Sequence, residues 1–309
     1  MRISSIDIGT NTILLLIADV DANNIARVVH DEQVIARLGK GVDEHHVINQ
    51  ETFRRAADFL RSYQEISGQF QSERIIAVGT SALRDASNKK EFCEFILRTV
   101  GISIEILSGN DEAEWTYRGA AAGIDASTEN FTVLDIGGGS TEIISGAGSQ
   151  ILNKVSLDIG CVRATERLLH TSPPTEREII ETRELIRINL KQINFERVGA
   201  SRAIGVAGTV TTLAAMHLQL AQYDPKQVHG YELHYNDILQ SFNLLKGKTY
   251  EEIKSIPQIS TGRVDVILAG VIILLEFMEA AGLEKIMVSD RGLRYGIILR
   301  EIERRKPSC

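Results

Sequence analysis

The sequence has few of the residues that mark several common classes of protein. It contains three cysteines and five prolines in 309 residues. Three scattered cysteines without a CxxC pair exclude a disulfide framework and favour reduced thiols in a cytoplasmic protein. The N-terminus lacks the pattern of a signal peptide. The longest apolar run, residues 266–275, is too short to span a bilayer, so we expect a buried helix there and no membrane association.

Other absences narrow the chemistry. The seven histidines form no HxH or HxxxH spacing, and the sequence has neither a GxxxxGK[ST] loop nor a Rossmann fingerprint. The formal net charge of −7 argues against a general nucleic-acid binder. A polyanionic ligand stays open, because local backbone N–H groups and a few arginines can outweigh a distant acidic surface.

A glycine turn that occurs twice is the most informative motif present. The phrases DIGTNT (residues 7–12) and DIGGGST (residues 135–141) each lie between two short apolar runs. The pattern predicts strand, tight turn and strand, with backbone N–H groups and hydroxyls that suit phosphate. Either turn alone is equally well explained as an ordinary tight turn, but two copies favour a duplicated fold. A third turn, GVAGTVTT (residues 205–212), opens a predicted helix, whose N-terminus attracts anions or simply needs close packing.

Several carboxylates accompany these turns. Asp135 and Glu142 flank the second turn, where paired acids suit Mg²⁺ or are simply solvated strand ends. The segment SGNDEAE (residues 108–114) places three acids in the first turn of a predicted helix. These acids either complement the helix dipole or include a general base for water. The spacing alone does not show which of the three acids would be that base. Arg84 and Arg37 are loop cations that bind phosphate or face solvent.

The order of the predicted elements indicates an α/β protein of two domains. In the first half we expect three antiparallel strands within residues 1–40, a helix over 49–67 between Asn49 and Gly68, strands at 74–78 and 102–107, and a helix over 110–122. In the second half we expect strands at 131–135, 141–144, 151–157, 203–206 and 285–289, a helix opened by a Thr175–Glu178 capping box, and a last helix over 292–305. The polar stretch 123–130 is a candidate hinge. The predicted domains are residues 1–124 and 125–309, with the last helix free to pack back on the first domain.

At this point the chain resembles the exopolyphosphatase and guanosine pentaphosphate phosphohydrolase (Ppx/GppA) family, within the superfamily of actin, sugar kinases and Hsp70. The resemblance covers nearly the whole chain and rests on these blocks in order: IDIGTNT at 6–12, RLGKG at 37–41, GTSALRDASN at 79–88, ILSGNDEAE at 106–114, LDIGGGSTEI at 134–143, GVAGTVTTLAA at 205–215 and SDRGLRYGII at 289–298. It implies two ribonuclease-H-like (actin-like ATPase) domains with an active site in an interdomain cleft.

The resemblance also implies roles for individual residues. Glu112 is expected to be the general base, and Asp135, Glu142 and Asp7 are expected to be metal ligands. The expected phosphate-binding residues are Gly9, Thr10, Asn11, Thr12, Arg84, Gly137, Gly138, Gly139, Ser140, Thr141, Gly208 and Thr209. The implied cofactor is Mg²⁺, with a role for a monovalent cation left open.

The expected activity is Mg²⁺-dependent removal of the terminal phosphate of inorganic polyphosphate. The alternative is 5′-phosphohydrolysis of pppGpp, a nucleotide of the stringent response. A kinase of the superfamily is disfavoured because a kinase must exclude the water that a base at position 112 would activate. A non-catalytic (p)ppGpp-binding regulator is disfavoured because all three acids of the motifs are present. We expect no nucleic-acid or membrane partner, and a homodimer is one option for the oligomeric state.

Overall fold

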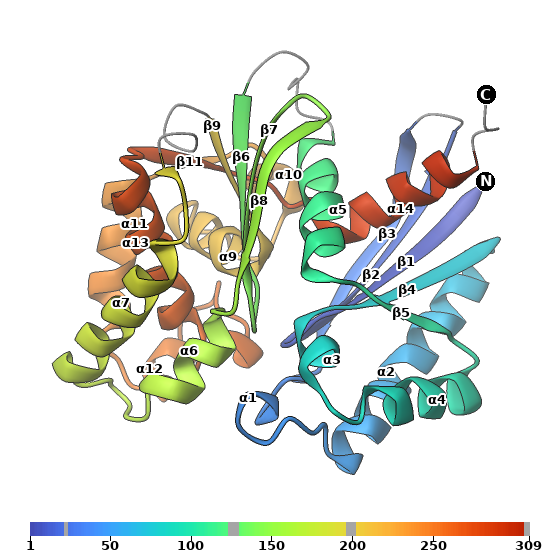
Figure 1. The fold of residues 1–309 in the computed structure, drawn as a ribbon, viewed down its shortest axis with the longest axis horizontal. Coiled ribbons are helices and arrows are strands. Elements are labelled where there is room, and N and C mark those ends of the chain that lie inside the picture. Colours follow the sequence, from blue (N-terminus) through green and yellow to red (C-terminus); the bar gives the residue numbers. More distant parts are fainter. Residues whose placement is uncertain (22–23, 123–129, 196–201, 306–309) are drawn as a thin grey trace. The chain divides into compact units, whose positions relative to one another are not determined.

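The computed structural model describes residues 1–21, 24–122, 130–195 and 202–305. The chain forms two compact units, Met1–Ala122 with Gly292–Cys309 and Gly123–Arg291. Each unit holds one mixed β-sheet with helices against it (Figure 1). The predicted α/β class with two sheets is therefore confirmed.

The first unit is built on a five-stranded sheet. Its described elements are β1 (Arg2–Ile8), β2 (Thr12–Val20), β3 (Ile25–Ile35), α1 (Val42–His45), α2 (Gln50–Gln69), β4 (Arg74–Gly79), α3 (Ser81–Asp85), α4 (Lys89–Val100), β5 (Ile104–Ile106), α5 (Gly109–Ala121) and α14 (Leu293–Arg304). The strand order is β3-β2-β1-β4-β5. β1, β2 and β3 pair antiparallel, as the sequence predicted, whereas β4 and β5 add in parallel.

Apolar side chains of this sheet point to both faces because they alternate along β1 and β2. Ile6 and Ile8 pack with Leu15 in the core that α2 and α4 cover. Ile3 and Leu16 pack on the opposite face against Ile298 and other residues of α14. Figure 1 shows α2 and α4 on one side of the sheet and α14 on the other.

α14 comes last in the sequence but belongs to the first unit. It crosses α5 at close range, since a Cβ added at Gly296 would lie 1.8 Å from the carbonyl oxygen of Trp115. Arg118 of α5 also donates to Glu303 of α14 (2.7 Å). The structure therefore groups this helix with residues 1–122. The predicted division placed it in 125–309 and left open that it packs back on the first domain. The predicted hinge and domain boundary fall on residues 123–129, which lie outside the described residues.

The second unit repeats the plan of the first. Its described elements are β6 (Asn130–Ile136), β7 (Thr141–Ala147), β8 (Gln150–Leu157), α6 (Cys161–Leu168), α7 (Glu176–Leu190), β9 (Arg202–Val206), α9 (Ala207–His217), α10 (Pro225–Val228), β10 (Glu232–His234), α11 (Tyr235–Leu245), α12 (Tyr250–Lys254), the 3₁₀ turn η1 (Thr261–Arg263), α13 (Ile267–Ala281) and β11 (Lys285–Val288). The strand order is β8-β7-β6-β9-β11-β10. As in the first sheet, three antiparallel strands are followed by two parallel ones, here β9 and β11, and β10 then pairs antiparallel with β11 at the edge. The two glycine turns therefore occupy equivalent places between the first two strands of each unit.

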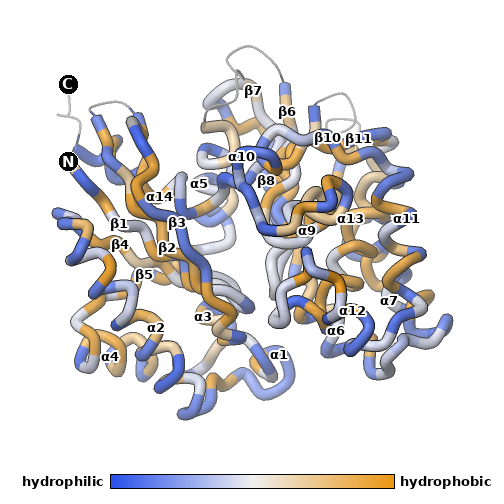
Figure 2. Tube along the Cα trace, turned by 180° about the vertical axis from the view of Figure 1, so that it is seen from behind, coloured by the Kyte–Doolittle hydropathy of each residue, from blue (hydrophilic) through white to orange (hydrophobic). Residues whose placement is uncertain are grey.

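α13 is the apolar run 266–275 that the sequence assigned to a buried helix. The helix is buried from Ile267 to Met278, and Figure 2 colours it as hydrophobic over most of its length. It contains one acid in that stretch, Glu276, which accepts from Arg187 of α7 at 2.5 Å and pairs with Arg183 at 3.0 Å. The prediction of a buried helix is confirmed, and within the described residues no helix is long and apolar enough to cross a membrane.

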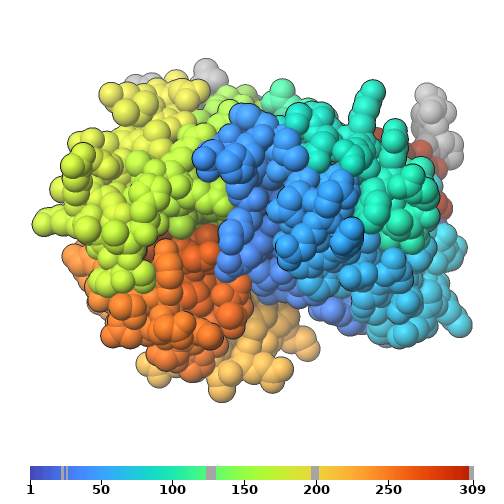
Figure 3. All heavy atoms as spheres, turned by 90° about the horizontal axis from the view of Figure 1, so that it is seen from below, coloured from blue at the N-terminus to red at the C-terminus, as the bar shows by residue number. Residues whose placement is uncertain are grey.

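The predicted N-terminal caps of α2 and α7 are also confirmed. Asn49 accepts from the Thr52 N–H (2.8 Å) at the start of α2, and Thr175 with Glu178 forms the expected capping box of α7. The predicted stop at Gly68 was wrong, because α2 continues to Gln69. Figure 3 shows the α6–α7 segment beside α12 on one face of the second unit, where the Tyr250 N–H donates to Ser172 (2.8 Å).

Candidate active site

The second glycine turn is a tight hairpin between β6 and β7. The Gly137 N–H donates to the Ser140 carbonyl (3.0 Å), so Gly138 and Gly139 form its tip. Ser140 and Thr141 are buried, and the Thr141 hydroxyl donates to the Ile159 carbonyl (2.5 Å). The Thr141 side chain therefore anchors the turn to the next segment, and the backbone at the tip is left as the candidate anion-binding surface.

The turn is held from behind by the first residues of α6. The N–H groups of Cys161 and Val162 donate to the carbonyls of Gly137 (2.9 Å) and Gly138 (2.8 Å). These N–H groups belong to the first turn of a helix and would otherwise have no intrahelical partner. The backbone of the turn is thus fixed by contacts within the second unit.

Two carboxylates lie directly below the turn. Asp135 on β6 is paired with Glu142 on β7 in the antiparallel register. Side chains of such a pair share one face with Cβ atoms about 5 Å apart, and like charges there repel. Glu142 is 1% exposed, and the Ser156 hydroxyl of β8 donates to its Oε1 (2.8 Å).

This carboxylate pair fits a hard divalent cation. Mg²⁺ prefers oxygen ligands and is usually bound by one or two carboxylates together with water and substrate phosphates. A cation would also offset the repulsion between Asp135 and Glu142. Within the described ranges, no group of three or more His, Cys, Asp or Glu side chains is placed to hold a metal by itself.

The first glycine turn has the same backbone but different side chains. The Gly9 N–H donates to the Thr12 carbonyl (2.9 Å), which matches the bond from Gly137 to Ser140. Thr10, Asn11 and Thr12 are each 8% exposed. Asp7 is half-buried and is paired with Leu14 rather than with a second acid.

The RLGKG segment supports this first turn. The N–H groups of Arg37 and Gly39 donate to the carbonyls of Asn11 (2.9 Å) and Thr10 (2.8 Å). Gly39 is needed for the close approach, since a Cβ there would lie 2.2 Å from the Thr10 methyl. The Arg37 backbone has a left-handed φ of 49° at this bend.

Glu112 forms a buried ion pair with Arg84. Glu112 is 7% exposed in the first turn of α5, and its Oε2 lies 2.7 Å from Arg84 Nη1. The same guanidinium nitrogen donates to the Leu107 carbonyl (3.2 Å), which fixes the arginine against the strand that precedes α5. Glu112 and Arg84, which separate sequence motifs indicated as candidate site residues, are thus in direct contact.

Burial raises the pKa of the Glu112 carboxyl above its ordinary value of 4.5, Arg84 opposes this shift, and Asp85 adds to it. A carboxyl with a raised pKa is the more basic group, as a general base for water requires. The geometry and the electrostatics together separate Glu112 from its acidic neighbours.

Those neighbours have structural partners. Asp111 is exposed and accepts from the Ser108 hydroxyl (2.6 Å), while the Asp111 N–H donates back to Ser108 (3.1 Å) at the helix N-cap. Glu114 pairs with Arg118 one turn later (3.3 Å). Glu112 is therefore the buried member of the three acids whose roles the spacing left open.

The third glycine turn begins α9 and is covered by an arginine. A Cβ at Gly208 would lie 1.2 Å from Arg263 Nη1, so the guanidinium lies directly on the glycine. Thr209 is 3% exposed, and its hydroxyl packs against α13, since a Cβ at Gly270 would lie 2.2 Å from it. This orientation leaves the backbone N–H of Thr209, and not its side chain, as the group that suits a phosphate.

Sequence reasoning missed three contributors in the second unit, which are Ser156, Gly160 and Arg263. Ser156 lies in an ordinary strand pattern, and Arg263 follows Gly262 with no motif around it. The available signal for Gly160 was a glycine shortly after a strand and directly before a helix.

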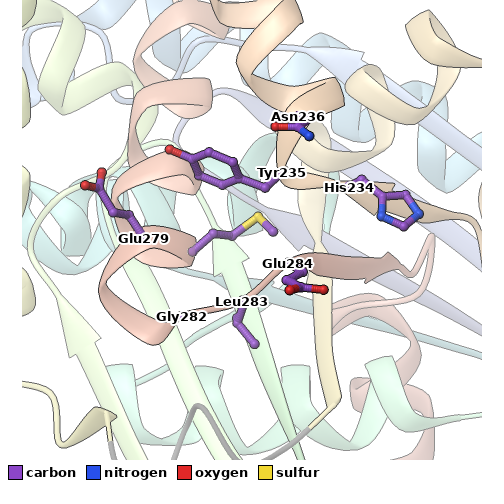
Figure 4. Close-up of a pocket in the computed structure, with 8 residues that line it drawn as sticks. His234, Tyr235, Asn236, Glu279, Gly282, Leu283 and Glu284 are labelled. Carbon is purple, nitrogen blue, oxygen red and sulfur yellow. The ribbon is translucent and has the colours of Figure 1, made fainter.

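A pocket on the second unit lies among other residues. It has a volume of about 450 Å³ and is lined by His234, Tyr235 and Asn236 at the start of α11 and by residues at the end of α13 (Figure 4). None of the predicted site residues lines it. It therefore has no part in the assignments that follow.

The comparison with protein families decides the identity. Residues 16–305 match the model of the Ppx/GppA phosphatase family. The chain belongs to the Ppx/GppA phosphatase family. The resemblance drawn from the sequence motifs is thereby confirmed.

Individual members of the Ppx/GppA family are similar over the whole chain. Exopolyphosphatase 2 of Mycobacterium tuberculosis is 36% identical over 312 residues, which cover 96% of this chain and 98% of that protein. The crystal structure of the Aquifex aeolicus Ppx/GppA member is 33% identical, covers 100% and 99% of the two chains, and has a TM-score of 0.84. An exopolyphosphatase structure from Cytophaga hutchinsonii is 30% identical, covers 98% of each chain, and has a TM-score of 0.90.

These relationships establish the class of reaction. The protein is a hydrolase of phosphoanhydride bonds. The two-sheet architecture described above is that of the Ppx/GppA structures.

Proposed function

We propose that this protein is an exopolyphosphatase that removes the terminal phosphate of inorganic polyphosphate with Mg²⁺ as its metal ion. The observation that carries the proposal is the buried Glu112–Arg84 pair, because a basic carboxylate in a hydrolase is the group that activates water. The 36% identity to exopolyphosphatase 2 of Mycobacterium tuberculosis over almost the entire chain supports the choice of polyphosphate.

In this proposal the protein catalyses the reaction by positioning the reacting groups and stabilising charge, because phosphoryl transfer requires little covalent chemistry from the protein. Glu112 orients the attacking water and takes its proton at a carboxylate oxygen. Arg84 holds the Glu112 carboxylate in one orientation through its 2.7 Å contact. The first unit thus supplies the base.

The second unit supplies the phosphate-binding groups. The backbone N–H groups of Gly138 and Gly139 bind oxygens of the terminal phosphate, and the N-terminus of α9 at Gly208 adds a second anion-binding end. Gly9 and Thr10 of the first turn serve the same purpose on the other unit. Asp135 and Glu142 would hold Mg²⁺, which would offset charge on the phosphate oxygens. Asp7 is proposed as a carboxylate for a metal ion at the turn of the first unit.

The test is phosphate release by the purified protein from short polyphosphate, long polyphosphate, pppGpp and ATP, each with Mg²⁺ and with a chelator. We expect Mg²⁺-dependent release from polyphosphate and little from ATP. Release from pppGpp alone would contradict the exopolyphosphatase assignment and favour the alternative activity. Formation of ADP from ATP without a matching amount of free phosphate, measured separately, would instead indicate a kinase.

Absence of hydrolysis combined with tight binding of guanosine tetraphosphate would contradict the enzymatic proposal and favour a regulator. The intact set of Glu112, Asp135 and Glu142 argues against that result. The reaction would be followed as free phosphate, so all four substrates are compared with one readout.

A further inference from the structure

The first turn of α6 and the second glycine turn form a fixed unit. Three N–H groups of α6 point at two carbonyls of the turn: Cys161 at Gly137 (2.9 Å), Val162 at Gly138 (2.8 Å) and Arg163 at Gly138 (3.1 Å). All these groups lie in the second unit. The helix start is therefore used to hold the backbone of the turn.

This arrangement determines where the N–H groups of the turn point. A trans peptide plane carries its C=O and its N–H on opposite sides. Because the carbonyls of Gly137 and Gly138 face α6, the N–H groups of Gly138 and Gly139 face away from it. Neither of these two N–H groups donates a hydrogen bond to any residue that the structure describes.

Gly160 permits the contact between α6 and the turn. Its backbone is extended, with φ −141° and ψ 173°, so a left-handed conformation does not explain the glycine. A Cβ at this position would instead lie 2.5 Å from the carbonyl carbon and oxygen of Gly138 and 2.7 Å from the Gly137 oxygen. Backbone atoms cannot yield as a flexible side chain does, so any side chain at position 160 must displace the turn or the helix.

We infer that Gly160, with the first turn of α6, is a positioning residue that aims the N–H groups of Gly138 and Gly139 at the phosphate. The inference rests on the proposed function, which assigns phosphate binding to this turn. Gly160 acts through the turn and does not itself touch substrate. The sequence motif that ends at Thr141 is therefore incomplete without a glycine nearly twenty residues later.

The test compares Gly160→Ala with Gly247→Ala. Gly247 has no atom near its would-be Cβ, so the same chemical change there causes no clash. We expect Gly160→Ala to lower kcat for short polyphosphate by about 10²-fold, since a displacement of about 1 Å can have this effect. We expect its affinity for inorganic phosphate to fall about tenfold or more. Its affinity for Mg²⁺, measured without phosphate, should stay the same because Asp135 and Glu142 are untouched.

A merely structural role would give a different pattern. Equal losses of phosphate and Mg²⁺ affinity would overturn the inference, because the whole unit would then be damaged. Unchanged phosphate affinity and kcat would overturn it as well. If the unaltered protein hydrolyses no substrate, the proposed function fails, but the phosphate-binding comparison still decides this inference.

A second pair of variants keeps the test valid if Gly160→Ala does not fold. Cys161→Pro removes the donor to the Gly137 carbonyl, and proline suits the first helical position after an extended residue such as Gly160. Cys161→Ser keeps the N–H. Burial raises the pKa of the Cys161 thiol to about 11, so the thiol itself is unreactive and its loss alone is not expected to matter. Weaker phosphate binding in Cys161→Pro than in Cys161→Ser supports the inference, and equal binding overturns it.

Discussion

The two glycine hairpins have the same backbone and different chemistry. In each, the leading glycine N–H donates to a carbonyl three residues later, and a following segment donates to two carbonyls of the turn. In the second hairpin Asp135 lies opposite Glu142, whereas in the first Asp7 lies opposite Leu14. A duplicated fold thus places a carboxylate at both turns but a carboxylate pair at only one.

The difference shows how a duplicated fold can divide its chemistry. The second unit has the acid pair that suits a metal ion and a turn of three glycines. The first unit has hydroxyl and amide side chains at its turn and a buried carboxyl, the proposed base Glu112, on α5. The predictions below alter one side of this comparison at a time.

The largest effect is expected at the base that the first unit contributes. Glu112→Gln should lower kcat for polyphosphate by about 10²–10⁴-fold, because the amide cannot accept the proton of water. The matched control is Glu114→Gln, two residues away and paired with Arg118, which should retain near-normal turnover. Steady-state phosphate release measures both, and equal turnover in the two variants would remove Glu112 from the role of base.

The next largest loss of activity is expected when the second hairpin is given the Asp–Leu pairing of the first. Glu142→Leu reproduces the Asp–Leu pairing and removes one proposed metal ligand. We expect kcat/KM to fall about 10²-fold or more, since a bound metal contributes several kcal/mol to the transition state. Glu142→Gln removes the charge but keeps a polar side chain, so its comparison with Glu142→Leu separates the two losses. Normal kcat/KM in both variants at low Mg²⁺ would show that the carboxylate pair is not the metal site.

A smaller effect is expected from Ser156, whose hydroxyl donates to Glu142 of the carboxylate pair. Ser156→Ala removes the 2.8 Å hydrogen bond to Glu142 and should weaken Mg²⁺ activation about 10- to 100-fold, as the loss of an outer partner of a metal ligand does. Ser145→Ala is the control, because that hydroxyl bonds Thr132 instead (2.9 Å). The Mg²⁺ concentration at half-maximal rate is the measurement, and the same value in both variants would contradict the prediction.

The smallest effect concerns stability and pH. The pKa of Glu112 is raised in the folded protein, so between pH 4.5 and that higher value the folded chain holds a proton that the unfolded chain has lost. This contribution to stability is present at low pH and disappears as the pH rises through the folded pKa. It amounts to about 1.4 kcal/mol for each pH unit of that window.

Glu112→Gln has no such proton to lose. The Tm of the unaltered protein minus that of the variant should therefore decrease as the pH is raised from about 4.5. Thermal unfolding from pH 4 to 8 provides the measurement. A difference that stays constant or grows with pH would show that the carboxyl is not destabilised by burial.

Much of the fold was predictable because its signals are local. Alternating apolar residues, the Asn49 cap and the Thr175 capping box fix strands and helix starts through neighbours in sequence. The grouping of α14 with the first unit was not resolved by position in the chain, since it depends on contact between Gly296 and Trp115, far apart in sequence.

The candidate site shows the same limit. The sequence motifs predicted candidate phosphate-binding turns, but their spacing could not choose among Asp111, Glu112 and Glu114. That choice follows from burial and from the distance to Arg84, which lies on another helix. Gly160 and Ser156 were missed because each acts through a tertiary contact with the second hairpin.

Mg²⁺ binding to the unaltered protein, Glu142→Gln and Asp7→Asn tests the division between the hairpins most directly. Calorimetric titration in the presence of inorganic phosphate reports on the metal without requiring turnover. The account predicts that Glu142→Gln weakens Mg²⁺ binding strongly. Asp7→Asn should weaken Mg²⁺ binding less, because Asp7 lies opposite Leu14 and not opposite a second acid. A greater loss in Asp7→Asn, or unchanged binding in Glu142→Gln, would contradict it.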